Sequence, residues 1–338
     1  MALPDSIMLL VKCMTYNQKA FIEDAMNGFC MQKTSFPFIC IIMDDCSTDG
    51  EQDTIKNYFQ EHFTQLNEKG TDNYIFHLGK HKTNEKCYFA VFFLKYNHYS
   101  IKKSKDFYYT EWLDKCKYIA MCEGDDYWTD ENKLQIQVDF LEKHPEYSCS
   151  GHGFIVKNRK KNEETDYTIY DNNNERFTFT INDFCKKWVL KTLTCIYKKE
   201  VFEKYIEKKY QYGKDLNLQY HALEMGNGIY FPKPMGVYNI HDSGVWSAIS
   251  KDEQAKRNYL TIKELFYRNK KDIIIKPIYI NILSNYLNYE HDNSLKSRLI
   301  KEKNRLLNNE SVIKRLLMML THPRYIAGWL KRIILNQK

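Results

Sequence analysis

The sequence lacks the features that mark several classes of protein. Its 338 residues include only 13 glycines and 7 prolines, so no collagen-like or linker-dominated region is present. No run of 18 uncharged apolar residues occurs, which predicts that no helix spans a membrane. Residues 1–12 lack the pattern of a secretory signal, and we expect none. Hydrophobic residues still make up 43% of the chain and charged residues 28%, which is enough for a globular core.

Two nucleotide-binding motifs are also missing. No G-x-G-x-x-G follows the first predicted strand, and no G-x-x-x-x-G-K-[ST] occurs anywhere. These absences count against a dinucleotide oxidoreductase and against a P-loop NTPase. The ten cysteines form no C-x-x-C pair, and Cys40 and Cys122 lie inside apolar runs. Scattered buried thiols indicate a reducing cytosol rather than a disulfide framework, so we expect a cytoplasmic location.

Positive charge is concentrated at the C-terminal end. The formal net charge is +7, yet Ser294 to Lys338 alone contains eleven Lys or Arg and two acids, so the rest is slightly acidic. A body that binds nucleic acid is therefore not expected. Within 311–338, residues 311–320 and 323–335 are predicted to be short helices, and the second has an apolar face with Trp329 and a cationic border. Such a helix fits a membrane interface, or packing on the protein or on a second copy, equally well.

The first half of the chain alternates short apolar runs with helical patterns, which is typical of βαβ units and a largely parallel sheet. Strands are predicted over residues 6–14, 38–43, 74–78, 117–122 and 149–156, and helices over 19–31, 51–66 and 134–141. Residues 82–106 are expected to form a helix followed by an insertion, and 157–174 a surface loop or hairpin. From Glu253 onward the pattern is helical and Lys-rich. We therefore expect an α/β domain over 1–250 and a basic helical extension over 251–338.

Acidic residues follow two of the predicted buried strands. Asp44 and Asp45 follow FICIIM, and Glu123 to Asp126 follow KYIAMC. Ligands of open parallel sheets bind beyond the carboxyl ends of the strands, so these carboxylates are expected to converge on one hard cation shared with phosphate. A single Asp at such a place more commonly caps a helix or turn. Three carboxylates in four residues would repel one another without a cation, which favours a site.

Thr15, Tyr16 and Asn17 follow the first predicted strand. They offer a hydroxyl, an aromatic face and an amide. These groups suit a base and ribose better than a pyrophosphate.

Four segments resemble the family 2 glycosyltransferases, which have the GT-A fold of nucleotide-diphospho-sugar transferases. They are TYNQKAFIEDAMNGFCMQ (15–32), IIMDDCSTDG (41–50), CEGDDYWTDENKLQIQVDFLEKHPEY (122–147) and GVYNIHDSGVWS (236–247). The third is the most specific, because it is similar to the metal-site motif of the family and its following helix. The resemblance covers residues 6–250. It implies a Rossmann-like α/β fold with a mixed, mostly parallel sheet flanked by helices.

The resemblance also implies roles for single residues. Thr15, Tyr16 and Asn17 would line the nucleotide pocket, and Asp45 would hydrogen-bond a pyrimidine base. Glu123-Gly124-Asp125 stands where the family carries D-x-D, with Glu123 a departure from that motif; Glu123 and Gly124 would contact the nucleotide, and Asp125 would bind Mn²⁺ or Mg²⁺. Asp126 would support the metal or face the donor sugar. His241 would close the metal site or touch the diphosphate, although a lone histidine is more commonly structural.

The catalytic base is expected at Asp215. Family 2 enzymes invert the anomeric carbon, so a carboxylate must take the proton of the acceptor hydroxyl. Relatives often show Gly-Asp before an aromatic-rich helix, and the corresponding stretch here is Gly213-Lys214-Asp215. The inserted Lys214 breaks that pattern. A helix-capping role for Asp215 is the alternative.

These features together predict an inverting, metal-dependent hexosyltransferase-type enzyme. It would move a sugar from a nucleotide-diphospho-sugar, UDP-linked by expectation, to a hydroxyl of a cell-surface glycan such as capsule or lipopolysaccharide. The acceptor would be a glycan or a lipid-linked glycan, the location cytoplasmic or peripheral at the inner face of the membrane, and a homo-oligomer is compatible with the sequence.

Two other functions remain open. A nucleotide-sugar-binding protein without catalysis would explain the departures at Glu123 and Lys214. A metal-dependent nucleotidyltransferase is disfavoured, because Leu9 to Gln18 has neither the Gly nor the Arg typical of that class.

Overall fold

A computed structural model gives the fold and describes residues 3–4, 6–168, 175–184, 190–242, 244, 246, 249–269 and 272–308. The chain divides into two compact units. The first comprises Met1–Thr180, Val189–Glu207 and His221–Ser247, and the second comprises Ile181–Trp188, Lys208–Tyr220 and Ala248–Lys338. The two helices predicted within 311–338 lie outside the described residues.

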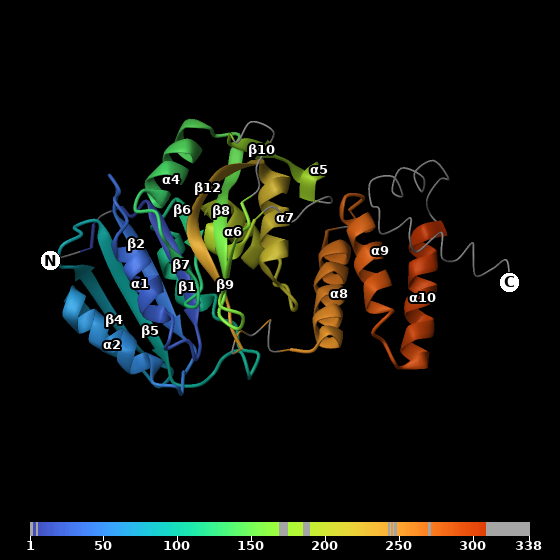
Figure 1. The fold of residues 1–338 in the computed structure, drawn as a ribbon, viewed down its shortest axis with the longest axis horizontal. Helices are drawn as coiled ribbons and strands as arrows, with labels where there is room; N and C mark the ends of the chain where they lie inside the picture. Colours follow the sequence, from blue (N-terminus) through green and yellow to red (C-terminus); the bar gives the residue numbers. More distant parts are fainter. Residues whose placement is uncertain are drawn as a thin grey trace. The chain divides into compact units, whose positions relative to one another are not determined.

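The first unit is built on a twelve-stranded sheet of mixed direction (Figure 1). Its strand order is β10-β12-β8-β11-β6-β1-β2-β5-β4-β3, with β7 paired to β12 and β9 paired to β8. The strands are β1 (Leu9–Thr15), β2 (Phe38–Asp44), β3 (Phe63–Gly70), β4 (Tyr74–His81), β5 (Cys87–Leu94), β6 (Tyr118–Met121), β7 (Tyr127–Trp128), β8 (Tyr147–Asn158), β9 (Glu163–Asp166), β10 (Phe177–Phe179), β11 (Ile196–Lys198) and β12 (Asn227–Ile240). The predicted α/β class is confirmed.

The centre of the sheet is parallel, which brings several strand ends to one edge. Strands β6, β1, β2 and β5 run in the same direction. Thr15 pairs with Asp44 at the ends of β1 and β2, and Lys12 pairs with Met121 near the end of β6. The loops that follow β1, β2 and β6 therefore start at the same edge, as the sequence predicts.

The described residues form the helices α1 (Ile22–Cys30), α2 (Glu51–His62), α3 (Phe107–Leu113), α4 (Lys133–Lys143), α5 (Ile181–Phe184), η1 (Thr192–Thr194), α6 (Lys199–Glu207), α7 (Asp215–Met225), α8 (Lys251–Arg268), α9 (Ile275–Tyr286) and α10 (Asn293–Asn308). Within the first unit, helices cover both faces of the central sheet. On one face, apolar residues of α1, α2 and α4 pack with Val11, Cys13 and Ile42 in the main core. On the other face, Lys12 of β1 lies against the rings of Tyr109 in α3 and Phe202 in α6.

Two predicted elements differ from the structure, one at its end and one in its type. The helix expected over 51–66 ends at His62, and Phe63 begins strand β3. Residues 82–106 contain a fully buried strand, β5, where a helix was expected. The run CYFAVFFL is apolar at every position because both faces of the strand are covered, and such a run has neither the helical period nor the alternation of a half-buried strand. The hairpin alternative for 157–174 is confirmed in its first part, because β8 pairs antiparallel with β9.

The C-terminal part of the second unit is helical, as the pattern after Glu253 predicts. Helix α8 packs on α9 through stacked tyrosines, with the rings of Tyr259 and Tyr286 5.0 Å apart. Glu302 of α10 accepts hydrogen bonds from the hydroxyl groups of Tyr259 and Tyr279. None of the helices that the structure describes is both long and apolar enough to cross a membrane.

Candidate functional site

Three carboxylates lie close together in the short loop between β6 and β7, residues 122–126, which we call the acidic loop. Oxygens of Glu123, Asp125 and Asp126 all lie within 4.8 Å of one another. Asp126 is buried, and its burial, followed by the charges of Asp125 and Glu123, raises its pKa well above the ordinary value. A divalent cation would relieve this repulsion, and a set of carboxylate oxygens is the donor set that Mn²⁺ and Mg²⁺ prefer. The chemistry of the cluster therefore fits the predicted metal.

Hydrogen bonds from Asn239, near the C-terminal end of β12, hold the acidic loop in place. The backbone N–H of Asn239 donates to Asp126 Oδ1 at 2.9 Å, and its side-chain Nδ2 donates to the carbonyl of Asp125 at 2.6 Å. Arg159 Nε donates in turn to Asn239 Oδ1 at 2.9 Å. Sequence reasoning missed both Asn239 and Arg159. The only available signal was that Asn239 lies two residues before His241.

His241 contacts Asp125, although the two residues lie 116 positions apart in the sequence. A ring nitrogen, Nε2, lies 3.0 Å from Asp125 Oδ2, and the imidazole is buried. The ring also packs against Phe21, with centroids 4.4 Å apart. The structure thus brings together the two residues that the resemblance assigns to the metal.

At Gly124 the acidic loop lies in close contact with the end of β1. A Cβ atom at this position would lie 2.4 Å from Thr15 Oγ1 and 2.7 Å from Gln18 Oε1. The Gly124 N–H also donates to the carbonyl of Met14 at 3.0 Å. No side chain fits in this contact, so a glycine is needed for the acidic loop to approach the loop that begins at Thr15.

Glu51, at the start of α2, connects the loops that follow β1 and β2. Its carboxylate accepts hydrogen bonds from the Thr15 hydroxyl, from the Gln18 N–H at 2.8 Å and from the Ser47 hydroxyl at 2.9 Å. The side chain is fully buried, and this burial raises the pKa of Glu51 to about 7. Sequence reasoning took this residue only as the start of a helix.

Asn17 also connects the two loops that follow β1 and β2. Its N–H donates to Ser47 Oγ at 2.9 Å, and its Oδ1 accepts from the Thr48 N–H at 2.8 Å. Asn17 has a φ of 53°, in the left-handed region that Asn tolerates better than most side chains. Tyr16, between the two anchored residues, exposes its ring.

A cleft of about 480 Å³ opens beside these loops and is lined by Asn17, Lys19, Ala20, Phe21 and Asp49. Phe21 is also the ring that packs on His241. The cleft therefore borders both the predicted nucleotide loop and the predicted metal site.

Asp45 is buried at the end of β2 and anchors the loop that joins β5 to α3. Its Oδ1 accepts from the His98 N–H at 2.7 Å. Its Oδ2 accepts from the Tyr99 N–H at 3.1 Å and from Lys105 Nζ at 2.6 Å. These contacts were not predicted, and a role of Asp45 in base recognition stays a prediction.

Asp215 is the first residue of α7 and belongs to the second unit. Its Oδ1 accepts from the N–H of Leu216 at 3.0 Å, and Asn217 Oδ1 accepts from the N–H of Lys214 at 3.1 Å. The helix start is thus capped by Asn217 as well as by Asp215. Its role as a base stays a prediction.

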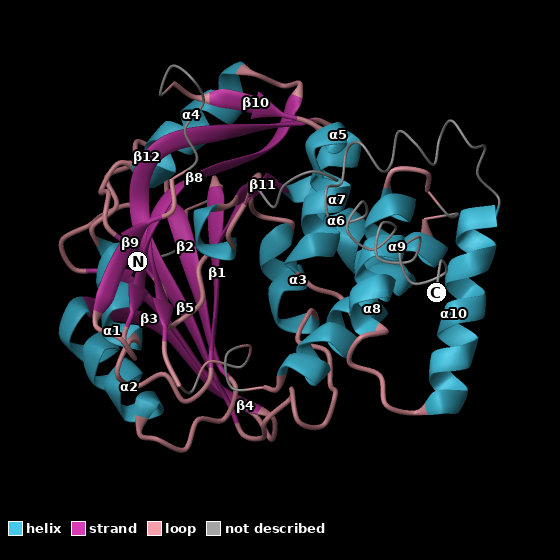
Figure 2. Cartoon of the chain, turned by 45° about the vertical axis from the view of Figure 1, so that its right-hand side comes forward, coloured by secondary structure: helices cyan, strands magenta, loops and turns pink. Residues whose placement is uncertain are grey.

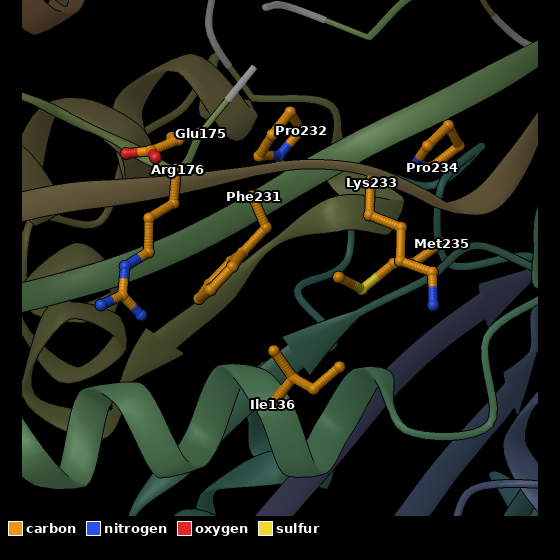
Figure 3. Close-up of a pocket in the computed structure, with 8 residues that line it drawn as sticks. All are labelled: Ile136, Glu175, Arg176, Phe231, Pro232, Lys233, Pro234 and Met235. Atoms are coloured by element: carbon orange, nitrogen blue, oxygen red, sulfur yellow. The ribbon is translucent and has the colours of Figure 1, made fainter. Parts of the chain in front are cut away.

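A larger hollow of about 610 Å³ lies on β12 and α4. Figure 3 shows Phe231 pointing toward Ile136 of α4. The residues that line this hollow are Ile136, Glu175, Arg176, Phe231, Pro232, Lys233, Pro234 and Met235. None of them is a residue that the sequence analysis singled out.

Comparisons with known proteins support the fold. No family model matches the sequence. The chain is 26% identical over 247 residues to the uncharacterized proteins Rv1520 of Mycobacterium tuberculosis (strain ATCC 25618 / H37Rv) and Mb1547 of Mycobacterium bovis. Each match covers 71% of this chain and 61% of the relative, so the chain spans about three fifths of the length of the curated relatives it matches.

Among solved structures, a TarS fragment from S. aureus in complex with UDP-GlcNAc matches 84% of this chain and 81% of its own, with a TM-score of 0.51 and 14% identity. At this identity the likeness concerns the fold. The chain shares the α/β fold of TarS, with its large mixed sheet flanked by helices.

Proposed function

We propose that the chain is an inverting glycosyltransferase that moves a sugar from a UDP-linked donor to a hydroxyl of a cell-surface glycan or lipid-linked glycan. The observation that supports this best is the convergence of Glu123, Asp125 and Asp126 beside the loop that begins at Thr15. TarS, which shares the fold, was solved with UDP-GlcNAc, a donor of the proposed class.

The acidic loop would hold Mn²⁺ or Mg²⁺ through Asp125, with His241 beside it and Asp126 in support. Such an ion, when bound, stabilises the negative charge that develops on the leaving nucleoside diphosphate. Asn239 keeps the loop in place by binding both its backbone and Asp126. The three carboxylates are thereby arranged before any ligand arrives, which limits the cost of ordering them on binding.

The donor would bind in the cleft beside Asn17 and Phe21. Glu51 and Asn17 fix the two loops at this place, so the nucleotide would meet a preformed surface. Asp215 would accept the proton of the acceptor hydroxyl while the hydroxyl oxygen attacks the anomeric carbon. Alignment of donor and acceptor would supply much of the remaining rate enhancement.

A screen of nucleotide sugars tests this proposal. The full chain is incubated with single donors and Mn²⁺, and the release of nucleoside diphosphate is measured. We expect release from a UDP-sugar, none with a chelator, and none from the Asp125→Ala variant. Asp139→Ala, which removes an exposed carboxylate of α4, is the matched control and should remain active.

Two results would contradict the proposal. Tight binding of nucleotide sugars without release of nucleoside diphosphate from any of them would favour the binding protein without catalysis. Release of pyrophosphate from a nucleoside triphosphate and a sugar phosphate would favour a nucleotidyltransferase.

A further inference from the structure

The loop that joins β5 to α3, residues 95–106, and the first residue of α3 together expose several large apolar side chains. The exposed fraction is 59% for Tyr99, 58% for Ile101 and 79% for Phe107, and Tyr96 is also exposed. Phe107 is the most exposed large hydrophobic residue in the described part of the chain. Figure 2 shows this loop leaving β5 and entering α3. Large exposed apolar side chains are thus concentrated in one short segment of the chain, and apolar side chains that form a contiguous exposed patch mark an interaction surface.

The loop is anchored firmly at its base, so the exposure does not come from a lack of packing. Asp45 binds the N–H groups of His98 and Tyr99 and the ammonium of Lys105. The His98 ring is buried, with Nδ1 2.9 Å from the Tyr96 carbonyl and Nε2 3.2 Å from the Tyr108 hydroxyl. The loop is therefore held in one conformation while Tyr99 and Ile101 remain in solvent.

Cations accompany these apolar side chains. Lys95, Lys102 and Lys103 are exposed. Within the part of the chain that the structure describes, no carboxylate lies within ion-pair distance of their ammonium groups. Lys103 Nζ lies 5.5 Å from the Tyr96 ring centroid. The one acid of the loop, Asp106, accepts a hydrogen bond from the Ser104 hydroxyl at 2.8 Å. The surface is thus apolar and positively charged at once.

This combination distinguishes between classes of partner. The core of a protein interface is typically depleted in lysine, so three exposed lysines among the apolar side chains fit such a partner poorly. The interface of an anionic bilayer suits both components. Aromatic and aliphatic side chains enter the headgroup region there, and lysines lie against the lipid phosphates.

We propose that residues 95–107 form a membrane-contact loop for anionic lipid. Tyr99, Ile101 and Phe107 enter the headgroup region, while Lys95, Lys102 and Lys103 meet the phosphates. The contact stands apart from the proposed enzymatic reaction and does not depend on it. Because the loop is anchored on Asp45, it would bring the end of β2 close to the bilayer surface.

Vesicle co-sedimentation of the full chain tests this proposal. Sucrose-loaded vesicles contain either phosphatidylglycerol mixed with phosphatidylcholine or phosphatidylcholine alone. We expect binding to the mixed vesicles that weakens with added salt. The double variant Ile101→Ser/Phe107→Ser should bind at least about tenfold more weakly. Lys102→Ser/Lys103→Ser should lose roughly fivefold per lysine and most of the salt dependence.

The control variant Tyr167→Ser/Ile273→Ser removes apolar side chains of similar exposure, 57% and 55%, elsewhere on the chain. It should bind vesicles like the unchanged chain. All variants should keep the same unfolding temperature, since each changes only exposed side chains.

Two results would overturn the proposal. If the Ile101/Phe107 and Lys102/Lys103 variants pellet like the unchanged chain, any membrane binding belongs to another segment, such as 311–338. If the unchanged chain ignores vesicles but forms a dimer that Ile101→Ser/Phe107→Ser dissociates, the loop is a protein interface.

Discussion

Replacing Gly124 by alanine should disturb the candidate site while leaving the rest of the fold intact. The new Cβ would lie 2.4 Å from Thr15 Oγ1, whereas ordinary van der Waals contact begins at 3.4 Å, so one group must move by about 1 Å. Thr15 cannot easily move, because its hydroxyl is hydrogen-bonded to the buried side chain of Glu51. The acidic loop is the part expected to move.

The size of the effect follows from two costs. Overpacking in a tight contact typically costs about 1–3 kcal/mol of stability. Metal–ligand distances, by contrast, tolerate deviations of only about 0.2 Å, so a shift of about 1 Å in the loop should impair binding more than folding. We expect Gly124→Ala to raise the Kd for UDP in the presence of Mn²⁺ at least about tenfold, which corresponds to about 1.4 kcal/mol.

Isothermal titration calorimetry with UDP and Mn²⁺, together with urea unfolding, measures both costs. Gly70→Ala in β3 is the matched control, because a Cβ there has nothing within 4 Å, and it should leave Kd and stability nearly unchanged. If Gly124→Ala binds UDP and unfolds like the unchanged chain, the close approach of the acidic loop to Thr15 is not what shapes the site.

Two further predictions concern single carboxylates. Burial raises the pKa of Glu51 from its ordinary value of 4.5 to about 7, so between these values the folded chain holds a proton that the unfolded chain has lost. Stability should therefore fall as pH rises between these values, by up to roughly 3 kcal/mol, and Glu51→Gln should remove that part of the slope. Urea unfolding at about pH 5 and about pH 8 checks this, and an equal slope in both proteins would refute it. Asp215→Asn should lower turnover ~10²–10⁴-fold with donor binding little changed. Steady-state kinetics with the donor found in the screen measures this effect. Activity close to that of the unchanged chain would contradict the role of Asp215 as the base, and Asp183 and Glu224 would be tested next.

Much of the central fold could be predicted because its signals are local. The runs that become β1, β2 and β6 are apolar, short and followed by polar residues, so their carboxyl ends could be located from the sequence. The parallel arrangement then places Thr15, Asp44 and the loop after Met121 at one edge. Strand β5 escaped prediction because its buried run carries no periodicity, and β3 because its polar sequence continued a helical pattern.

The contacts that shape the candidate site could not be predicted, since they join residues far apart in sequence. Glu51 reaches Thr15 and Gln18 only after β1 and β2 have paired. Asn239 reaches the acidic loop because β12 pairs with β7, in the register of Val237 opposite Tyr127. Asp45 binds a loop more than fifty residues ahead because β5 lies next to β2. No spacing in the sequence encodes these pairings.

The central claim is that the acidic loop binds a nucleoside diphosphate through a divalent cation. Calorimetric titration of UDP into the full chain, once with Mn²⁺ and once with a chelator, tests it most directly. We predict a Kd at least about tenfold lower with Mn²⁺, and loss of this difference in Asp125→Ala but not in Asp139→Ala. Equal affinity with Mn²⁺ and with the chelator would contradict the account.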